Sequence, residues 1–584
     1  MLKRVMTLFL ICGVALSLGA LASAQNLRGV WVDTKSIPRT PEEITTMVDQ
    51  LYHVGFNAIF LESFYHGETI YPSSFLASLG LPKQQKLFAE AGYDPLEVFL
   101  SEAHKRSMQV HAWVHIFYIS LDEAGEILNL YPHWAVVSKE GKPGYQSGNH
   151  FFFWLCPMEK EIWDFYLNLF SEIAEKYPVD GIHFDYCRFP EFTLADTCYA
   201  QAHRQSFFAS YGLDPITLSP LENPTAYKQW IQFRTEQLTE FVRYLTSNLK
   251  NRFPALLLSC AIKPLGFPLG LYPGALQDWP TWGKEKLFDF LVAMTYTSRP
   301  REFEGMVHWV GTFLEETPFA AGVWAFNQKT ETILEEIKRA LCYCYPLTGI
   351  VIFAYPYLSK ETLHALTQEF LSGNCSPTKA FLPLSFYQVN HRSAHVFFTQ
   401  EAVTVDGILS ETSWKRADWQ NNFITITGEP SRYSTSFALL YDKENLYCAF
   451  KLELLTPTQS RFREHDSPVF YEPSVEIFID PFANSGIWYQ IAINYNGTVY
   501  DSFSLTGSRF NGNWKVAVHK DSNDTLYIEI ALPFQELGKR PEKGEIWGAN
   551  FCRNEPEKDE FSVFSPVPGL YATPTLLGNI IFEK

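Results

Sequence analysis

The feature that most constrains this chain is an eightfold alternation of short apolar segments with longer segments of helical period between residues 26 and 372. The short segments are rich in β-branched and apolar residues, and the longer ones repeat apolar residues at the spacing of an amphipathic helix. The expected strands are residues 27–34, 57–64, 110–117, 181–186, 255–263, 290–297, 319–326 and 349–355. Eight such units predict an α/β domain of the (β/α)8 TIM-barrel class, with an open doubly wound sheet as the alternative.

Helix-start signals and missing motifs favour the barrel. Pro41 with two following glutamates, and Asp94 followed by Pro95, are typical first turns of helices. The first expected strand is not followed by Gly-x-Gly-x-x-Gly, and the sequence has no P-loop. A nucleotide-binding crevice of an open sheet therefore has no support.

The first 24 residues have the three parts of a secretory signal peptide. Lys3 and Arg4 precede an apolar run over residues 6–22, which ends in the small-residue site Ala22-Ser23-Ala24. A retained membrane anchor is the alternative, but the run is short of the ~20 residues that a span needs. No later stretch is long enough to cross a bilayer, so we expect a secreted, periplasmic or cell-envelope protein without a membrane span after signal removal.

Charge and cysteine usage exclude several classes of protein. With 47 basic against 64 acidic residues the formal charge is −17, which disfavours nucleic acid as a partner. Cys12 lies in the signal, and the other nine of the ten cysteines are scattered without CxxC pairs. Neither a zinc site nor a dense disulfide framework is indicated, although Cys187 with Cys198, or Cys342 and Cys344 with other cysteines, could pair in an oxidising compartment.

Alternation along each strand predicts which side chains point into the barrel. Because the helix-facing residues should be apolar, the residues between them should face the interior, near the carboxyl ends where barrel enzymes place their chemistry. Among these inward residues and Arg188, just beyond the fourth strand, the expected substrate-binding residues are Asp33, His111, Trp113, His115, His183, Arg188, Lys263, Tyr296, Trp324 and Tyr355.

Two inward carboxylates suggest glycoside cleavage. Asp185, at the end of the fourth strand, is predicted to be the nucleophile or base, and Glu62, on the second strand, the acid. Rivals for the acid role are Asp278, which we count as a third candidate catalytic residue, together with Glu191 and Asp33. The alternative for Asp185 is an ion pair with Arg188 and no chemistry. Two glycosidase carboxyls should lie within about 10 Å of each other.

The inward histidines leave a metal site open as an alternative. His111, His115 and His183 project into the same interior as Asp185, which would suit a metal-dependent amidase or deacetylase. H-x-W-x-H is a weak signal, and no HExxH or CxxC accompanies it. We therefore expect no catalytic metal and no cofactor for catalysis.

Several motifs of the barrel segment resemble a known family. The runs RGVWVDT, YDPLEVFLSEAHKRSMQVHAWVH and VDGIHFDYCRFP are similar to the glycosyl hydrolase-like 10 family, as are the tetrapeptide YPSS (Tyr71–Ser74), Asp278-Trp279 and Tyr296. The resemblance spans almost all of residues 26–372. It implies a secreted (β/α)8 domain that hydrolyses glycans, including cell-wall glycan strands, with Asp185 at the position of a key aspartate.

The C-terminal part has a different pattern. Residues 373–402 are rich in Pro, Ser and Asn and are expected to be a linker. Residues 403–584 contain short alternating strands with turns, which predict an all-β sandwich. The runs VDGILSETSW, VEIFIDP and EIALPF resemble carbohydrate-binding module family 9.

That second resemblance implies a sugar clamp and a structural cation. Trp488, Trp514 and Trp419 are the candidate stacking residues, with core packing as the alternative for each. Calcium would stiffen the sandwich, with Asp480 and the acidic loops as candidate ligands. Trp414 and Trp547 are expected in the core.

Together these features predict an exported glycoside hydrolase that acts on a poly- or oligosaccharide, with an appended carbohydrate-binding domain. The alternatives are a non-catalytic glycan-binding envelope protein and the metal-dependent amidase or deacetylase.

Overall fold

The computed structural model describes residues 27–191, 196–265, 275–372, 377–454, 460–483, 485–505, 510–571, 573 and 576–583. These residues form two compact units, and the boundary between them along the chain lies between Phe381 and Leu382, with Thr217–Gln232 assigned to the second unit. The predicted signal peptide lies outside the described residues.

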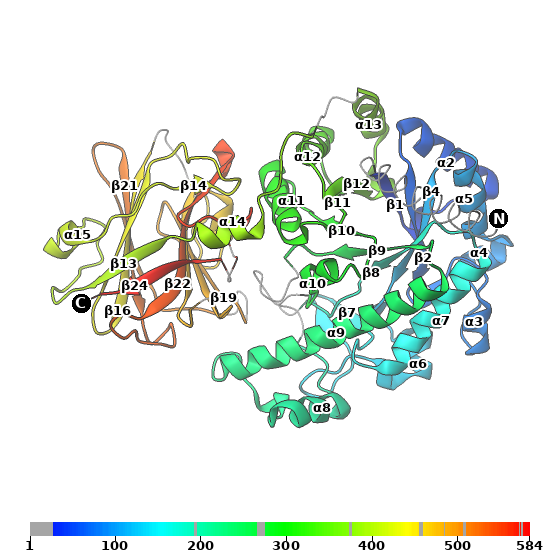
Figure 1. Ribbon diagram of the computed structural model, residues 1–584, viewed down its shortest axis with the longest axis horizontal. Coiled ribbons are helices and arrows are strands. Elements are labelled where there is room, and N and C mark those ends of the chain that lie inside the picture. The colour runs from blue at the N-terminus through cyan, green and yellow to red at the C-terminus, as the bar shows by residue number, and fades with distance from the viewer. Residues whose placement is uncertain are drawn as a thin grey trace, which may run out of the picture. The chain divides into compact units, whose positions relative to one another are not determined.

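Eight parallel strands of the first unit form a closed barrel (Figure 1). The strands are β1 (Leu27–Val32), β2 (Ala58–Tyr65), β4 (Gln109–His115), β8 (Gly181–Asp185), β9 (Leu257–Ile262), β10 (Phe290–Met294), β11 (Phe319–Trp324) and β12 (Leu347–Phe353). Each pairs with the next in chain order, and β1 pairs with both β2 and β12. This closure confirms the predicted barrel, and the open-sheet alternative is wrong.

The helices surround this ring of strands (Figure 1). They are α2 (Pro41–Val54), α5 (Pro95–His104), α7 (Lys160–Lys176), α9 (Pro224–Arg252), α10 (Trp279–Lys284), α11 (Pro300–Leu314), α12 (Thr330–Leu341) and α13 (Lys360–Ser372). Thr40 and Asp94 cap α2 and α5 by accepting hydrogen bonds from backbone N–H groups of the first turn. Every helix expected between the strands is present.

Three of the strand-to-helix connections contain inserted helices or strands. The first holds β3 (Glu68–Thr69), α3 (Ser74–Ser78) and α4 (Lys86–Ala91), and the third holds α8 (Gln201–Tyr211). The second contains α6 (Gly125–Leu130) and a small antiparallel sheet of β5 (Tyr118–Leu121), β6 (Tyr145–Ser147) and β7 (His150–Trp154). Our strand prediction did not include this sheet.

Aromatic side chains fill the barrel interior. Trp31, Phe60 and Trp113 form a cluster with small and branched residues of the other strands. Gly181 is required beside this cluster, because a Cβ there would lie 2.4 Å from Nδ1 of His111. The interior is therefore a packed core that forms the floor of the barrel mouth.

The second unit is an all-β domain. Its strands are β13 (Ser393–Phe398), β14 (Ile424–Thr425), β15 (Thr435–Tyr441), β16 (Asn445–Glu453), β17 (Ser474–Asp480), β18 (Tyr489–Asn494), β19 (Val499–Phe503), β20 (Lys515–Lys520), β21 (Thr525–Pro533), β22 (Ile546–Glu555), β23 (Glu560–Val563) and β24 (Gly578–Phe582). Two short helices accompany them, α14 (Leu384–Val389) and α15 (Thr412–Arg416).

The strands of this domain form one sheet that curls on itself. Two other strands, β24 and β13, separate β22 from β15 in the sheet order. Phe551 of β22 nevertheless stacks on Phe437 of β15 with ring centroids 3.8 Å apart. Neighbouring strands lie about 4.8 Å apart, so this contact requires the faces of the sheet to pack together as in the predicted sandwich.

The predicted linker contains part of this domain. Residues 373–402 include α14 and the strand β13, which pairs with β15 and β24. The segment Ser393–Phe398 alternates small or polar with apolar residues, a strand signal that the Pro- and Asn-rich composition around it obscured. Within the described residues, we find no helix with the length and apolar character of a membrane span.

Candidate active site

A pocket of about 520 Å³ opens at the carboxyl ends of the barrel strands. Of the predicted site residues it collects Asp33, Glu62, Trp113, His115, Asp185, Arg188, Glu191, Lys263, Tyr296 and Trp324. Another cavity, of about 640 Å³ beside α5 and the end of α7, contains none of them. The chemistry predicted from the sequence therefore gathers in one place.

Glu62 is held as a carboxylate. It is 4% exposed, its Oε2 accepts a hydrogen bond from the backbone N–H of Thr34 at 2.7 Å, and its Oε1 lies 3.1 Å from Nε2 of His115. Burial acts to raise the pKa of Glu62, but the contacts with His115 and Thr34 outweigh it and the pKa lies below its ordinary value. The predicted role of Glu62 as the acid does not fit this environment.

Asp185 closes the end of β8 with both oxygens engaged. Oδ2 accepts a hydrogen bond from the indole Nε1 of Trp113 at 3.1 Å, and Oδ1 accepts one from the backbone N–H of Tyr186 at 2.6 Å. Tyr186 has a φ of +50°, so the chain turns sharply here. Both oxygens of this carboxyl group are therefore held in place by hydrogen-bond donors of the barrel.

His115 joins the two carboxylates. Its Nε2 lies 3.1 Å from Glu62 and 3.8 Å from Asp185 Oδ2. Because one atom makes both contacts, these two carboxylate oxygens can be at most about 7 Å apart. This confirms the expected proximity and falls inside the range of glycosidase carboxyl pairs.

Asp33 has the opposite electrostatic character to Glu62. Its Oδ1 accepts a hydrogen bond from the backbone N–H of Ser36 at 2.9 Å. Burial raises the pKa of Asp33, the Ser36 hydrogen bond opposes this, and the charge of Glu62 adds to the rise, so that the pKa lies above its ordinary value. Neighbouring carboxyls with opposite pKa shifts are typical of acid and base pairs.

Cationic side chains line the same wall. The guanidinium of Arg188 lies over the rings of Tyr186 and Trp154, at 4.4 and 5.4 Å from their centroids. No ion pair joins it to Asp185 in the described part of the chain, so the alternative of a purely structural pair at this position is not supported. Lys263 forms an ion pair with Glu191. Burial and the charge of Arg188 lower the pKa of Lys263 to about 7, and Asp185 opposes them.

Aromatic rings also line the pocket. Trp324 stacks on Phe353 with centroids 5.5 Å apart, and Tyr296 lies 4.8 Å from Trp324. Both predicted residues are half-buried and line the pocket. Such faces suit the apolar faces of sugar rings.

Two predicted histidines lie outside the pocket. His111 and His183 are fully buried: His111 stacks on Phe60 and His183 Nδ1 lies 2.9 Å from Ser259 Oγ. Burial lowers the pKa of both. The alternation along the strands correctly predicted that both side chains point into the barrel, but it does not show how far they lie from the barrel mouth. Their assignment as substrate-binding residues is therefore wrong. The amidase or deacetylase alternative thereby loses its ligand set, since these histidines do not gather with His115 into any metal-binding group of described residues.

Asp278 and Tyr355 are also placed elsewhere. Asp278 is the N-cap of α10, where its side chain accepts from the backbone N–H of Thr281. Tyr355 lies beyond the end of β12, in a 3-10 helix, and donates a hydrogen bond to Gln50 of α2. Neither lines the pocket. Asp278 lies in a loop, and the sequence does not predict the path of a loop. Tyr355 was assigned by extending the strand alternation, which ends with the strand at Phe353.

Sequence reasoning missed other pocket residues, among them Tyr65, Tyr118 and Tyr357. Tyr65 reaches the pocket because the register of β2 shifts between Glu62 and Phe64, which reverses the alternation. Tyr118 comes from the inserted sheet, and the apolar run of residues 151–154 was the signal for that sheet.

The predicted sugar-stacking residues of the second unit differ in exposure. Trp488 is 1% exposed in a core cluster, so its assignment as a stacking residue is wrong. Trp414 and Trp547 are buried, as predicted. Trp419 and Trp514 are half-buried, and their indole N–H groups donate to Trp414 O and to Asp501 Oδ2. These two keep part of a ring face available.

The carboxylate oxygens of Asp480, the predicted calcium ligand, already accept hydrogen bonds. Its oxygens accept hydrogen bonds from Phe482 N, Ser485 Oγ and Gly486 N, which leaves them poorly suited to a cation. Among the described residues, His465, Asp466 and Asp501 bring one possible ligand atom each within 4.8 Å of one another. Asp501 is fully buried and its Oδ1 has no hydrogen-bond partner. This group fits a cation better than Asp480 does.

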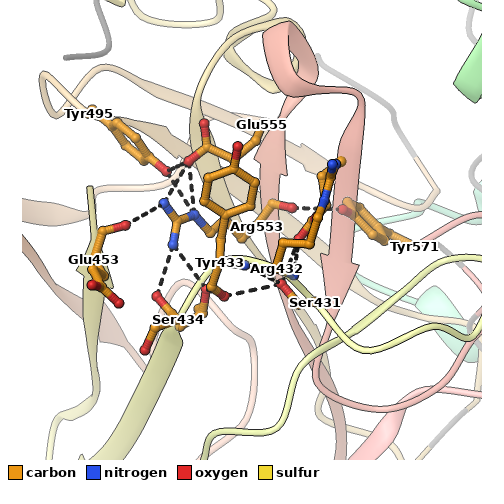
Figure 2. Close-up of polar contacts among 11 residues, drawn as sticks. Ser431, Arg432, Tyr433, Ser434, Glu453, Tyr495, Arg553, Glu555 and Tyr571 are labelled. Atoms are coloured by element: carbon orange, nitrogen blue, oxygen red, sulfur yellow. Dashed lines mark hydrogen bonds and ion pairs between the residues drawn. The ribbon is translucent and has the colours of Figure 1, made fainter. Parts of the chain in front are cut away.

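The second unit contains a buried ion pair between Arg553 and Glu555 (Figure 2). Arg553, 1% exposed, donates to Glu555 and to the hydroxyl of Tyr495, and also to the carbonyls of Ser434 and Glu453. Figure 2 shows these partners converging on one guanidinium from separate strands and loops. The network connects the two faces of the curled sheet and is fully paired, so we interpret it as structural.

Known families match both units. Residues 26–310 match the family model described as glycosyl hydrolase-like 10, and residues 405–564 match the one described as carbohydrate family 9 binding domain-like. The curated "Glycosyl hydrolase DigH" of Escherichia coli (strain K12) is 25% identical over 316 residues, covering 47% of this chain and 66% of the relative. "Glycosyl hydrolase YngK" of Bacillus subtilis (strain 168) is 22% identical over 289 residues, covering 46% of this chain and 51% of the relative. The chain thus spans between half and two thirds of the length of these relatives.

Two solved structures are similar to parts of this chain. The glycoside hydrolase domain of PgaB (BpsB) from Bordetella bronchiseptica is 16% identical, with a TM-score of 0.46, over 59% of this chain and 98% of that one. A carbohydrate binding module family 9 from Caldicellulosiruptor kristjanssonii, solved with cellotriose, is 19% identical, with a TM-score of 0.26, over 33% of this chain and 94% of that one. The closed barrel and the family match agree with the resemblance found in the sequence. The barrel therefore resembles the glycosyl hydrolase-like 10 family, and the second unit resembles the carbohydrate family 9 binding domain-like modules.

Proposed function

We propose that the barrel is a glycoside hydrolase that cleaves a poly- or oligosaccharide, with cell-wall glycan strands as the first substrates to test. The observation that carries the proposal is that Asp33, Glu62 and Asp185 line one pocket, in which the pKa of Asp33 is raised and that of Glu62 is lowered. The names of the relatives DigH and YngK support the same reaction class.

In this proposal Asp33 replaces Glu62 as the general acid. A protonated carboxyl with a raised pKa donates its proton to the glycosidic oxygen as the bond breaks. Asp185, hydrogen-bonded at both oxygens, supplies negative charge at the anomeric carbon, as the nucleophile or as the base that activates water. Glu62 remains ionised, raises the pKa of Asp33 and holds His115 between the carboxylates.

The remaining pocket residues position the sugar. Trp324, Tyr296 and Phe353 offer ring faces, whereas Arg188 and the Lys263–Glu191 pair offer hydrogen-bonding groups for hydroxyls. The second unit would hold the chain on its substrate and raise the local concentration of glycan. The signal-like N-terminal segment supports export to the cell envelope or beyond.

A substrate panel tests this function. The purified chain is incubated with peptidoglycan glycan strands, α-glucans and β-glucans, and products are identified by mass spectrometry. We expect new reducing ends from at least one glycan. Glycan binding without any product would overturn the enzyme and support the alternative, a non-catalytic glycan-binding protein of the cell envelope.

A further inference from the structure

Two buried cysteines of the first unit are in direct contact. The Sγ atoms of Cys156 and Cys198 lie 2.7 Å apart, and the two residues are 1% and 0% exposed. Cys156 follows the strand β7, whereas Cys198 lies in the connection between β8 and α8. The contact therefore links two insertions at the mouth of the barrel.

The backbone holds both cysteines through one shared segment. Leu155 forms a β-bridge with Ala135, and Thr197 forms one with Ser138. In addition, the N–H of Cys156 donates to Trp134 O at 2.7 Å, and the N–H of Tyr199 donates to Val137 O at 3.0 Å. The backbone of Cys156 and the residues on both sides of Cys198 are thus fixed by pairing with residues 134–138.

A histidine stands beside the pair with a defined orientation. His203 Nε2 lies 3.0 Å from Glu159 Oε1, so this nitrogen is placed to carry the proton and donate it. Nδ1, which then has a lone pair, lies 3.8 Å from Cys156 Sγ. His203 can therefore accept the proton that the Cys156 thiol loses.

We infer that Cys156 and Cys198 form a structural disulfide bond. The step is thiol–disulfide exchange with an external disulfide oxidant, R–S–S–R: the Cys156 thiolate attacks one sulfur and releases R–S⁻, and the Cys198 thiolate then attacks the mixed disulfide and releases the second R–S⁻. The two cysteine thiols are oxidised, and the two released R–S⁻ take up the two protons that the cysteines lose, that of Cys156 by way of His203.

The burial of the pair makes the bond structural rather than catalytic. Burial raises the pKa of the Cys156 thiol well above its ordinary value, so little thiolate forms once the chain has folded. The bond therefore forms as these two insertions come together, when the Cys156 thiol already lies beside His203 but its burial is incomplete, and it is then protected from reductants. It fixes Trp154, whose indole donates to Arg188 O at 3.0 Å, and with it the wall of the pocket that carries Arg188.

This pairing differs from the one that the sequence suggested. Cys187, the earlier candidate partner of Cys198, is instead a neighbour of Cys260 of β9, whose thiol pKa is raised by burial and by that contact. Cys448 and Cys552 are buried in the second unit. Cys448 is the internal reference for a reduced thiol in the peptide mapping.

Peptide mapping tests the bond directly. The full chain is sent to the periplasm of a bacterial host by a foreign signal sequence, denatured with an alkylating agent in the absence of reductant, digested and analysed by mass spectrometry. We expect a linked peptide pair that joins Cys156 to Cys198, and an alkylated Cys448. Alkylation of both Cys156 and Cys198, or a link from Cys198 to Cys187, would overturn the inference. Neither result depends on the proposed hydrolysis or on the native signal.

Thermal unfolding gives an independent test. Closing a loop of this length should raise the Tm of the barrel by about 5 °C, so a reductant present throughout unfolding should lower the Tm of the wild type by that amount. The double variant Cys156→Ser/Cys198→Ser is the control, and its Tm should not respond to the reductant. Equal responses of the two proteins would contradict the disulfide.

Discussion

Three carboxyl groups of similar intrinsic acidity receive different environments within one pocket. A backbone N–H and His115 contact Glu62, both oxygens of Asp185 accept hydrogen bonds, and the hydrogen bonds from Ser36 and the charge of Lys35 do not offset the burial of Asp33. These contacts shift the pKa values of Asp33 and Glu62 in opposite directions. The roles in the proposed reaction therefore follow from the groups that touch each carboxyl, several of which come from other strands.

Glu62→Gln tests the coupling between Glu62 and Asp33. An acid acts only while protonated, so the raised pKa of Asp33 sets the alkaline limb of kcat/KM. Removal of the Glu62 charge lowers that pKa, and the alkaline limb should move to lower pH. Glu90→Gln, an exposed carboxyl on α4, is the control and should leave the profile unchanged. An unmoved limb in Glu62→Gln would remove Asp33 from the acid role.

Arg553 gives a prediction about stability at the same scale. Replacing Arg553 by Met leaves Glu555 buried without its cation, which should cost ~3 kcal/mol of the free energy of unfolding of the second unit. Hydrogen exchange of the β22 peptide in increasing urea measures this loss. The double variant Arg553→Met/Glu555→Met should regain much of it. A loss below 1 kcal/mol in the single variant would contradict the structural importance of the network.

At the scale of elements, the sequence predicted the eight barrel strands and their helices because periodicity and capping are local properties. The position of a side chain along the barrel axis is not local. His111 and Trp113 both face inward, but only Trp113 reaches the pocket. Tyr65 points into the barrel because the register of β2 shifts. Tyr355 lies beyond the end of β12 and contacts Gln50 instead of the pocket.

The second unit shows the same limit of prediction. Alternation located its strands, but it does not distinguish the two faces of a sheet that curls on itself. Trp488 therefore resembled a surface residue in sequence although it lies in the core. Strand β13 was hidden because its neighbours along the chain have the composition of a linker.

Trp419 and Trp514 allow a test of the sugar-binding element. In the inactive background Asp185→Asn, substitution of either residue by Ala should weaken binding to the cleaved glycan about 10-fold, through the loss of ring stacking. Trp324→Ala in the barrel pocket is the comparison that separates the two binding regions. Unchanged glycan retention in both module variants would place the sugar site elsewhere.

A cation at His465, Asp466 and Asp501 is the second test at this scale. Carboxylate oxygens suit calcium, and the imidazole also suits zinc. We propose that calcium binds here, so a chelator should lower the Tm of the second unit and added calcium should restore it. Asp501→Asn should abolish this response, whereas Asp480→Asn should retain it. Restoration by zinc and not by calcium would reassign the metal.

At the scale of the whole molecule, the chain joins a barrel that resembles the glycosyl hydrolase-like 10 family to a domain that resembles the carbohydrate family 9 binding modules. In the proposed function, the module raises the effective concentration of glycan at the pocket. The proposed hydrolysis thus depends on the carboxyl groups at the barrel mouth, and the module would keep the protein on the glycan.

The rates of Asp185→Asn and Asp278→Asn on the glycan identified by the panel test the central claim most directly. Both changes replace a carboxylate by an amide, but Asp185 lies in the pocket and Asp278 is a helix N-cap, a position where Asn is equally favourable. We predict at least a ~10²-fold loss of kcat for Asp185→Asn with glycan binding intact, and wild-type rates for Asp278→Asn. Wild-type hydrolysis by Asp185→Asn, or an equal loss in both variants, would contradict the account.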